Sequence, residues 1–149
     1  NPGVIAPPPL IYATGLLISL WLQTFRPLPF LPPTLRRSAG LPLLGSGIFG
    51  MIASLRAMRG KKTNVNPRQP TIALVEEFPY TLTRNPIYLS FTLMYCGLTA
   101  LFNTLWGLLM LPFVLLTMYS GVIAREERYL EKKFGRAYRQ YKQRVRRWM

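Results

Sequence analysis

A run of forty residues without a charged side chain, from Asn85 to Ala124, limits most strongly what this 149-residue chain can fold into. An α-helix needs about 20 apolar residues to cross a membrane, so the run is long enough for two passes, with a turn expected at Asn103–Thr104. Residues 1–25 and 38–55 are also uncharged. We therefore expect an all-α integral membrane protein with transmembrane helices at 9–25, 40–57, 86–102 and 105–124.

The distribution of lysine and arginine predicts the topology of these helices. Three of the 19 basic residues lie between the first two helices, six between the second and third, none between the third and fourth, and ten after the fourth. The positive-inside rule then places the N-terminus, loop 59–84 and the C-terminus in the cytoplasm, in a bacterial inner membrane by our interpretation. A net charge of +14 also fits nucleic acid, but membrane lipids account for basic residues beside membrane spans, so we expect no nucleic-acid partner.

The start of the sequence carries two further expectations. The proline-rich opening has no basic residue and is not typical of a cleaved signal peptide. Because the sequence begins with Asn1 instead of methionine, we expect a few residues to precede it.

The residues that are absent exclude several kinds of chemistry. The chain has no histidine and no aspartate, and its acidic residues are five glutamates. A Ser-His-Asp hydrolase, a zinc enzyme with histidine ligands and a two-metal aspartate site are therefore excluded, and no metal site is expected. Any reaction must need little acid–base help from the protein.

A helical stripe of apolar residues runs through the basic C-terminal region. Its spacings of 4, 4, 3, 4 and 3 predict an amphipathic helix that lies at the membrane interface or packs on the core, with a break or kink at Gly135. Glu126 extends the stripe toward the N-terminus, whereas Glu127 and Glu131 are expected on the other side, with Arg128 pairing with Glu131. The stripe consists of Leu130, Phe134, Tyr138, Tyr141, Val145 and Trp148.

The segment "TRNPIY", residues 83–88, has two interpretations. In the first it begins a transmembrane helix, with Arg84 as interfacial anchor, Asn85 as N-cap and Pro86 at the first helical position. In the second it is one wall of a cofactor pocket, because a helical hairpin returns Glu126 to the same face as Asn85 and Tyr88.

Taken together, "LVEEFPYTLTRNPIY", a hydrophobic hairpin and "EERYLEKKFGRAYRQYKQRVRRW" resemble the isoprenylcysteine carboxyl methyltransferase family, which is related to the phospholipid N-methyltransferases. The resemblance covers roughly residues 72–148. It implies a single membrane methyltransferase domain over residues 1–149, with a helix pair at 1–58 and a cofactor-binding half at 59–149. It also implies S-adenosyl-L-methionine as cofactor and a lipophilic small molecule as methyl acceptor.

The resemblance assigns cofactor contacts residue by residue. Glu126 is expected to hold the ribose hydroxyls or the ammonium group, the tyrosines to lie against the adenine or the sulfonium, and Asn85 and Arg84 to bind the carboxylate. Arg125 is the expected partner of a carboxylate on the acceptor. The full set of expected cofactor residues is Leu74, Val75, Tyr80, Arg84, Asn85, Pro86, Ile87, Tyr88, Glu126 and Glu127.

The chain departs from the family pattern at two glycine positions, which carry Phe78 and Ser90. We expect Phe78 to place side-chain bulk at the cofactor site. The stretch "SGVIA" before the glutamate pair also lacks the arginine that is thought to orient the prenylcysteine carboxylate in the family. Three functions stay open: methylation of a lipid carboxylate, phospholipid N-methylation, and a non-catalytic membrane protein that keeps the fold. The sequence does not predict an oligomeric state.

Overall fold

The computed structural model describes residues 2–149, and this part of the chain contains helices and connecting segments but no strand. Prolines begin three of the helices, where their missing N–H and fixed φ suit the first helical turn. The elements in order are α1 Pro8–Phe25, α2 Pro33–Gly60, α3 Pro86–Phe102, α4 Leu105–Met118, the π-helical turn η1 Tyr119–Ile123, α5 Ala124–Phe134 and α6 Arg136–Arg144.

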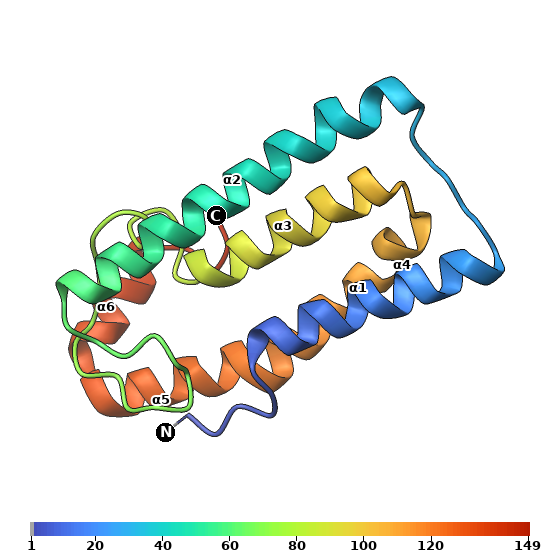
Figure 1. The fold of residues 1–149 in the computed structure, drawn as a ribbon. Helices are drawn as coiled ribbons and strands as arrows, with labels where there is room; N and C mark the ends of the chain where they lie inside the picture. Colours follow the sequence, from blue (N-terminus) through green and yellow to red (C-terminus); the bar gives the residue numbers. More distant parts are fainter. Residues whose placement is uncertain (1) are drawn as a thin grey trace.

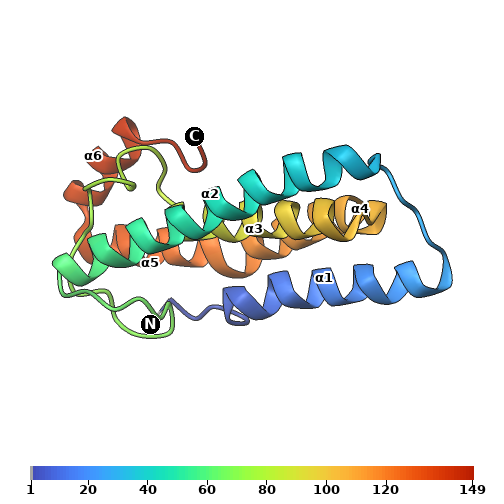
Figure 2. The same ribbon diagram turned by 45° about the horizontal axis from the view of Figure 1, so that its top comes forward.

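The helices form two packed pairs (Figure 1): α2 lies along α3, and α1 lies along α4. The turned view in Figure 2 shows α2 running along most of the molecule and α1 along part of it, with the α1–α2 connector at one end. Both termini, the segment between α2 and α3, and helices α5 and α6 gather at the opposite end. This arrangement places residues 59–84 and the C-terminus together, as the charge distribution predicted.

Close backbone contact joins α2 to α3. A Cβ atom on Gly47 would lie 2.7 Å from Ser90 O, and one on Gly97 would lie 2.6 Å from Leu44 N. Glycine is therefore required at both positions for the helices to approach this closely. The open side of Gly97 thus faces α2. At the α3–α4 contact, Gly107 packs against Thr99.

The turn between α3 and α4 lies at Asn103–Thr104, as expected, and it is tied to the α1–α2 connector. Asn103 adopts the left-handed conformation, with φ 52° and ψ 50°. Its Oδ1 accepts hydrogen bonds from Phe30 N (3.0 Å) and Leu31 N (2.8 Å), and its Nδ2 donates to Leu31 O (2.8 Å). One amide side chain therefore satisfies three backbone groups of a segment about seventy residues away in the sequence.

One expected boundary needs correction. Helix α2 begins at Pro33 rather than near residue 40, so Arg36 lies on a helix and not in the connection before it. From there its Nε and Nη2 donate to Leu101 O at the end of α3 (3.2 and 2.5 Å), a carbonyl that the helix itself leaves free. The expected break in the C-terminal helix at Gly135 is confirmed, since Gly135 has a φ of 51° and α5 ends before it.

Two helical stretches are long and apolar enough to cross a membrane: α2, and the 30-residue helix Leu105–Phe134 that joins α4, η1 and α5. Helix α3 is apolar but has 17 residues. Large apolar side chains on the outer faces are exposed, among them Trp21, Phe49 and Phe113. An apolar exterior of this kind is what lipid contact requires. The fold is therefore all-α and of membrane type, and four spans stay a prediction.

Candidate functional site

A pocket opens at the end of the bundle where the termini meet, and every one of the ten expected cofactor residues lines it. The pocket contains about 840 Å³ of space, its open mouth included. Several parts of the chain supply its walls: the stretch from the end of α2 to the first turn of α3, the start of α5, helix α6 and Pro2 in the N-terminal segment. Without the open mouth, the cavity volume is about 120 Å³. Small-molecule sites are typically concave and lined mainly by apolar side chains with a few polar groups, as this pocket is.

The first turn of α3 presents its backbone to the pocket. Pro86 occupies the first helical position and Asn85 precedes it, as predicted. The Asn85 side chain does not cap the helix, however, because its Nδ2 donates to Arg147 O (2.8 Å) in the C-terminal segment. Pro86 has no N–H, and Leu89 N donates to Asn85 O. The N–H groups of Ile87 and Tyr88 are therefore the ones left without a partner in the helix, and they give this end of α3 a partial positive charge.

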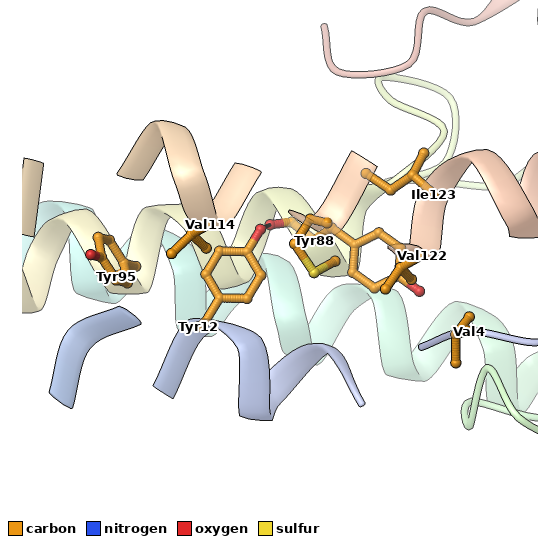
Figure 3. Packing of buried hydrophobic residues seen from close by; sticks show 8 residues of the cluster. Val4, Tyr12, Tyr88, Tyr95, Val114, Val122 and Ile123 are labelled. Atoms are coloured by element: carbon orange, nitrogen blue, oxygen red, sulfur yellow. Dashed lines mark hydrogen bonds between the residues drawn. The ribbon is translucent and has the colours of Figure 1, made fainter. Parts of the chain in front are cut away.

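Tyr88 connects the pocket to the core of the bundle. Its ring belongs to the buried cluster drawn in Figure 3, together with Tyr12, Val122 and Ile123. Its hydroxyl donates to Glu126 Oε1 at 2.7 Å. The carboxylate of Glu126 is thus held against α3 from the first turn of α5, which confirms that Glu126 turns toward the apolar side and is satisfied there.

Glu127 does not face away from the core as the helical stripe indicated. It is 8% exposed and lies between two arginines. Arg147 donates to it with two parallel hydrogen bonds, Nε to Oε1 and Nη2 to Oε2, both 2.8 Å, and Arg84 Nη1 lies 3.3 Å from Oε1. The expected pair of Arg128 and Glu131 is also absent.

In its place, Arg128 Nε donates to Ala124 O, and Glu131 pairs with Lys142 Nζ at 3.0 Å. The C-terminal segment and α6 cover the face of α5 that periodicity alone assigns to solvent. A helical period shows which residues share a face, but it does not show what covers that face.

Arg84 is the buried cation of the pocket. Its side chain is 9% exposed, and its Nε and Nη1 make no hydrogen bond within residues 2–149. A guanidinium buried in this way is costly unless an acceptor meets its N–H groups. The arginine therefore points to an anionic or strongly accepting ligand.

Aromatic side chains form the remaining polar wall. Tyr80, Tyr138 and Tyr141 line the pocket, and Tyr141 donates its hydroxyl hydrogen to Tyr80 O at 2.7 Å. Burial raises the pKa of Tyr138 to about 12 and raises the pKa values of Tyr80 and Tyr141 as well. These hydroxyls accordingly stay neutral, and they pack with Leu74, Leu130 and Phe134 as one cluster.

Three residues singled out in the sequence lie away from the pocket. Arg125 Nη1 donates to Gly3 O (2.8 Å), so this guanidinium faces the N-terminal segment. Phe78 is 54% exposed and does not line the pocket, so its side chain does not fill the pocket. Ser90 is buried where α2 crosses α3, and its Oγ donates to Pro86 O.

The segment that follows α2 contributes lining residues that sequence reasoning missed. Thr63 is buried, and its Oγ1 accepts from Ile72 N (3.0 Å), which folds residues 63–73 into a flap beside Leu74. The clustered Asn and Pro residues of "NVNPRQP" indicated a turn but not a pocket wall. The lining residues absent from the prediction are Pro2, Met58, Thr63, Asn64, Val65, Asn66, Pro67, Thr71, Ala73, Tyr129, Leu130, Tyr138 and Tyr141.

The exterior of the helices is apolar, and a pocket with a few polar groups lies at their charged end. These two features define a helical membrane protein with a candidate ligand site at one end of the bundle. Residues 35–137 match the model of the phospholipid methyltransferase family, and since this is more than half of the chain, the protein belongs to that family. Membership indicates methyltransferase activity.

The comparison with individual proteins adds one relative and no fold template. The chain is 48% identical, over 64 residues, to an uncharacterized protein of Haemophilus influenzae. The matched part is 42% of this chain and the whole of that protein. No solved structure matches the chain.

Proposed function

We propose that this protein is an S-adenosyl-L-methionine-dependent methyltransferase of the membrane and that the pocket at the end of the bundle holds the cofactor. One observation carries the proposal. In a chain that belongs to a methyltransferase family, ten residues expected to hold the cofactor come together in one pocket.

The side chains of the pocket fit the chemical groups of the cofactor. The unpartnered N–H groups of Arg84 suit a carboxylate, and they lie near the first turn of α3, whose N–H groups favour negative charge. Glu126 accepts one hydrogen bond from the chain, from Tyr88, so it keeps capacity for ribose hydroxyls or an ammonium group. The rings of Tyr80 and Tyr88 suit the adenine or the sulfonium.

Chemistry of this kind demands little acid–base catalysis. S-adenosyl-L-methionine supplies a methyl group on an already activated sulfonium, so transfer is an in-line displacement that depends on positioning. The residues named above bind and orient, and the absence of histidine and aspartate is compatible with that role.

The pocket lies at the end of the molecule that carries most of the basic residues. Arg26, Arg36 and Arg37 lie at the other end, so 16 of the 19 cations are on the pocket side. By the positive-inside rule we assign the pocket to the cytoplasmic face of a bacterial inner membrane, with four membrane-crossing helices. A lipophilic acceptor would then reach the pocket laterally from the membrane.

For the acceptor, the charges of the pocket favour the amine of a phospholipid over the carboxylate of an isoprenylcysteine-like lipid. Among the described residues that line the pocket, Arg84 is the only cation, and we assign it to the cofactor. Arg125, the expected partner of an acceptor carboxylate, contacts Gly3 instead. The exposed position of Phe78 also removes the reason to expect a non-catalytic protein.

Calorimetric titration of the purified protein in detergent with S-adenosyl-L-methionine tests the cofactor assignment. Saturable binding is expected for the wild type and for Phe78→Ala, whose side chain lies outside the pocket. Absence of saturable heat for the wild type would overturn the proposal.

Transfer of a labelled methyl group into a membrane-lipid extract tests the acceptor. Mild alkali hydrolyses a methyl ester to volatile methanol, whereas an N-methyl group stays on its amine even when the acyl chains of the phospholipid are removed. Non-volatile label on the amine headgroup supports phospholipid N-methylation, and label released as methanol supports a carboxylate acceptor.

A further inference from the structure

A segment close to the end of the described chain forms a strap across the start of α3. The three consecutive residues just before α3 donate hydrogen bonds to the backbone of this strap. The strap is defined as Val145–Trp148. Arg84 N donates to Arg146 O (2.9 Å), and both Thr83 Oγ1 (2.9 Å) and Asn85 Nδ2 (2.8 Å) donate to Arg147 O. Much of the hydrogen-bonding capacity of "TRN" is therefore spent on the strap rather than on the pocket.

The side chains of the strap anchor it further. Arg147 makes its two hydrogen bonds to Glu127, and its guanidinium carbon lies 5.0 Å from the centre of the Tyr119 ring. Hydrogen bonding to Glu127 raises the pKa of Arg147, so this side chain stays charged. Trp148 packs against the core cluster of the bundle. The strap is thus fixed on both sides of Arg147.

Glu127 stands between two guanidinium groups that compete for it. Arg147 takes both of its oxygens in a bidentate pair, which is the stronger geometry. Arg84 Nη1 is left in an ion pair with Oε1 at 3.3 Å, and neither its Nε nor its Nη1 makes a hydrogen bond. The cluster holds two positive charges and one negative charge, so a buried anion is the group that would complete it.

We propose that the strap is a positioning element of the cofactor site. By saturating Glu127, Arg147 keeps the N–H groups of Arg84 free for the cofactor carboxylate. Without Arg147, Glu127 would pair with Arg84 itself and withdraw those N–H groups from the pocket. Glu127 is then not a cofactor ligand, as the sequence suggested, but acts through Arg84. This inference rests on the proposed cofactor, and the experiment below separates the two.

Two ligands that differ only in the carboxylate provide the test: S-adenosylhomocysteine and its decarboxylated analogue, titrated calorimetrically. Arg147→Ala should weaken binding of S-adenosylhomocysteine about tenfold, as expected when one hydrogen-bonded charge pair is lost, and should leave the analogue within about twofold. Arg147→Lys should give an intermediate loss, because lysine cannot form the bidentate pair. The distinguishing result is the change in the affinity ratio of the two ligands.

Arg146→Ala is the matched control, because it removes the same charge from the neighbouring residue, whose side chain is exposed. Its affinity ratio should equal that of the wild type. An equal loss of both ligands in Arg147→Ala, or an unchanged ratio in both Arg147 variants, would overturn the positioning role. If the wild type binds neither ligand, the proposed cofactor itself fails. Should Arg147→Ala not fold, Arg147→Lys decides by the same ratio.

Discussion

The two ends of the helical bundle differ in which of their buried polar groups have hydrogen-bond partners. At the hairpin end, defined by residues 26–32 and the Asn103–Thr104 turn, Asn103 satisfies three backbone groups and Arg36 satisfies Leu101 O. The unpartnered atoms there are the neutral hydroxyls of Thr99 and Thr104. At the pocket end, the unpartnered atoms include two nitrogens of the charged Arg84.

This difference separates an end built for stability from an end built for a ligand. A buried hydroxyl without a hydrogen bond is a modest cost, whereas buried nitrogens of a charged guanidinium without hydrogen bonds are a larger one, even beside the carboxylate of Glu127. The hairpin end is therefore nearly complete as folded, and the pocket end is completed by an anion or acceptor from outside. Substitutions at the hairpin end should lower stability, and substitutions at the pocket end should lower affinity.

The largest effect is expected for Asn103→Ala at the hairpin end. The change leaves Phe30 N, Leu31 N and Leu31 O without partners and places alanine in a left-handed conformation. We expect the free energy of unfolding to fall by about 3 kcal/mol. Thermal unfolding in detergent, followed by circular dichroism, measures it.

Asn103→Gly is the matched control, because glycine tolerates the left-handed conformation but also lacks the amide. It should be less destabilising than alanine by about 1 kcal/mol. If both variants unfold at the wild-type temperature, the hairpin end is not the stabilising end and the comparison fails.

At the pocket end, Glu126→Gln is expected to change affinity instead of stability. Glutamine keeps the size and can still accept from Tyr88, but it loses the charge that an ammonium or ribose hydroxyls would use. Binding of S-adenosyl-L-methionine should weaken by about 2 kcal/mol. Calorimetry measures this loss, and the unfolding temperature should stay close to that of the wild type. A clear drop in stability with unchanged affinity would reverse the comparison.

The site was more predictable from the sequence than the surroundings of its charges. The pocket residues from Leu74 to Tyr88 belong to one continuous segment, and hydropathy alone predicts that the hairpin returns Glu126 to their level. The partner of Glu127 was not predictable, because Arg147 reaches it only through the tertiary position of the strap. Likewise, the first turn of α2 was not predicted, because the charged Arg36 and Arg37 interrupt the apolar stretch. Arg36 in fact lies on the helix and binds the end of α3.

A smaller effect is expected where the N-terminal segment is attached to the pocket end. Ile5 N donates to Gly121 O (3.1 Å) in the π-helical turn, and a Cβ on Gly121 would collide with the Ile5 side chain. Gly121→Ala should therefore destabilise the protein by about 1 kcal/mol. Unfolding temperature measures it, and adding Ile5→Ala should restore part of the loss if the collision is the cause.

Gly45→Ala is the control for a glycine in open surroundings, since a Cβ there has no neighbour within 4 Å. This exposed helical position should gain stability, by about 0.5 to 1 kcal/mol. Equal destabilisation by both alanine substitutions would show that the contact with Ile5 is not the cause of the effect at Gly121.

The smallest effect is expected for Phe78→Gly, which restores the glycine of the family pattern. Sequence reasoning expects this change to open the cofactor site and to raise affinity. The structure predicts otherwise, because Phe78 is 54% exposed and lies outside the pocket lining. Affinity for S-adenosyl-L-methionine should change by less than about twofold, or 0.4 kcal/mol, and calorimetry beside Glu126→Gln measures it. A tenfold gain in affinity would mean that the Phe78 side chain blocks the pocket. The buried charge of Arg84 would then not be the feature that limits binding.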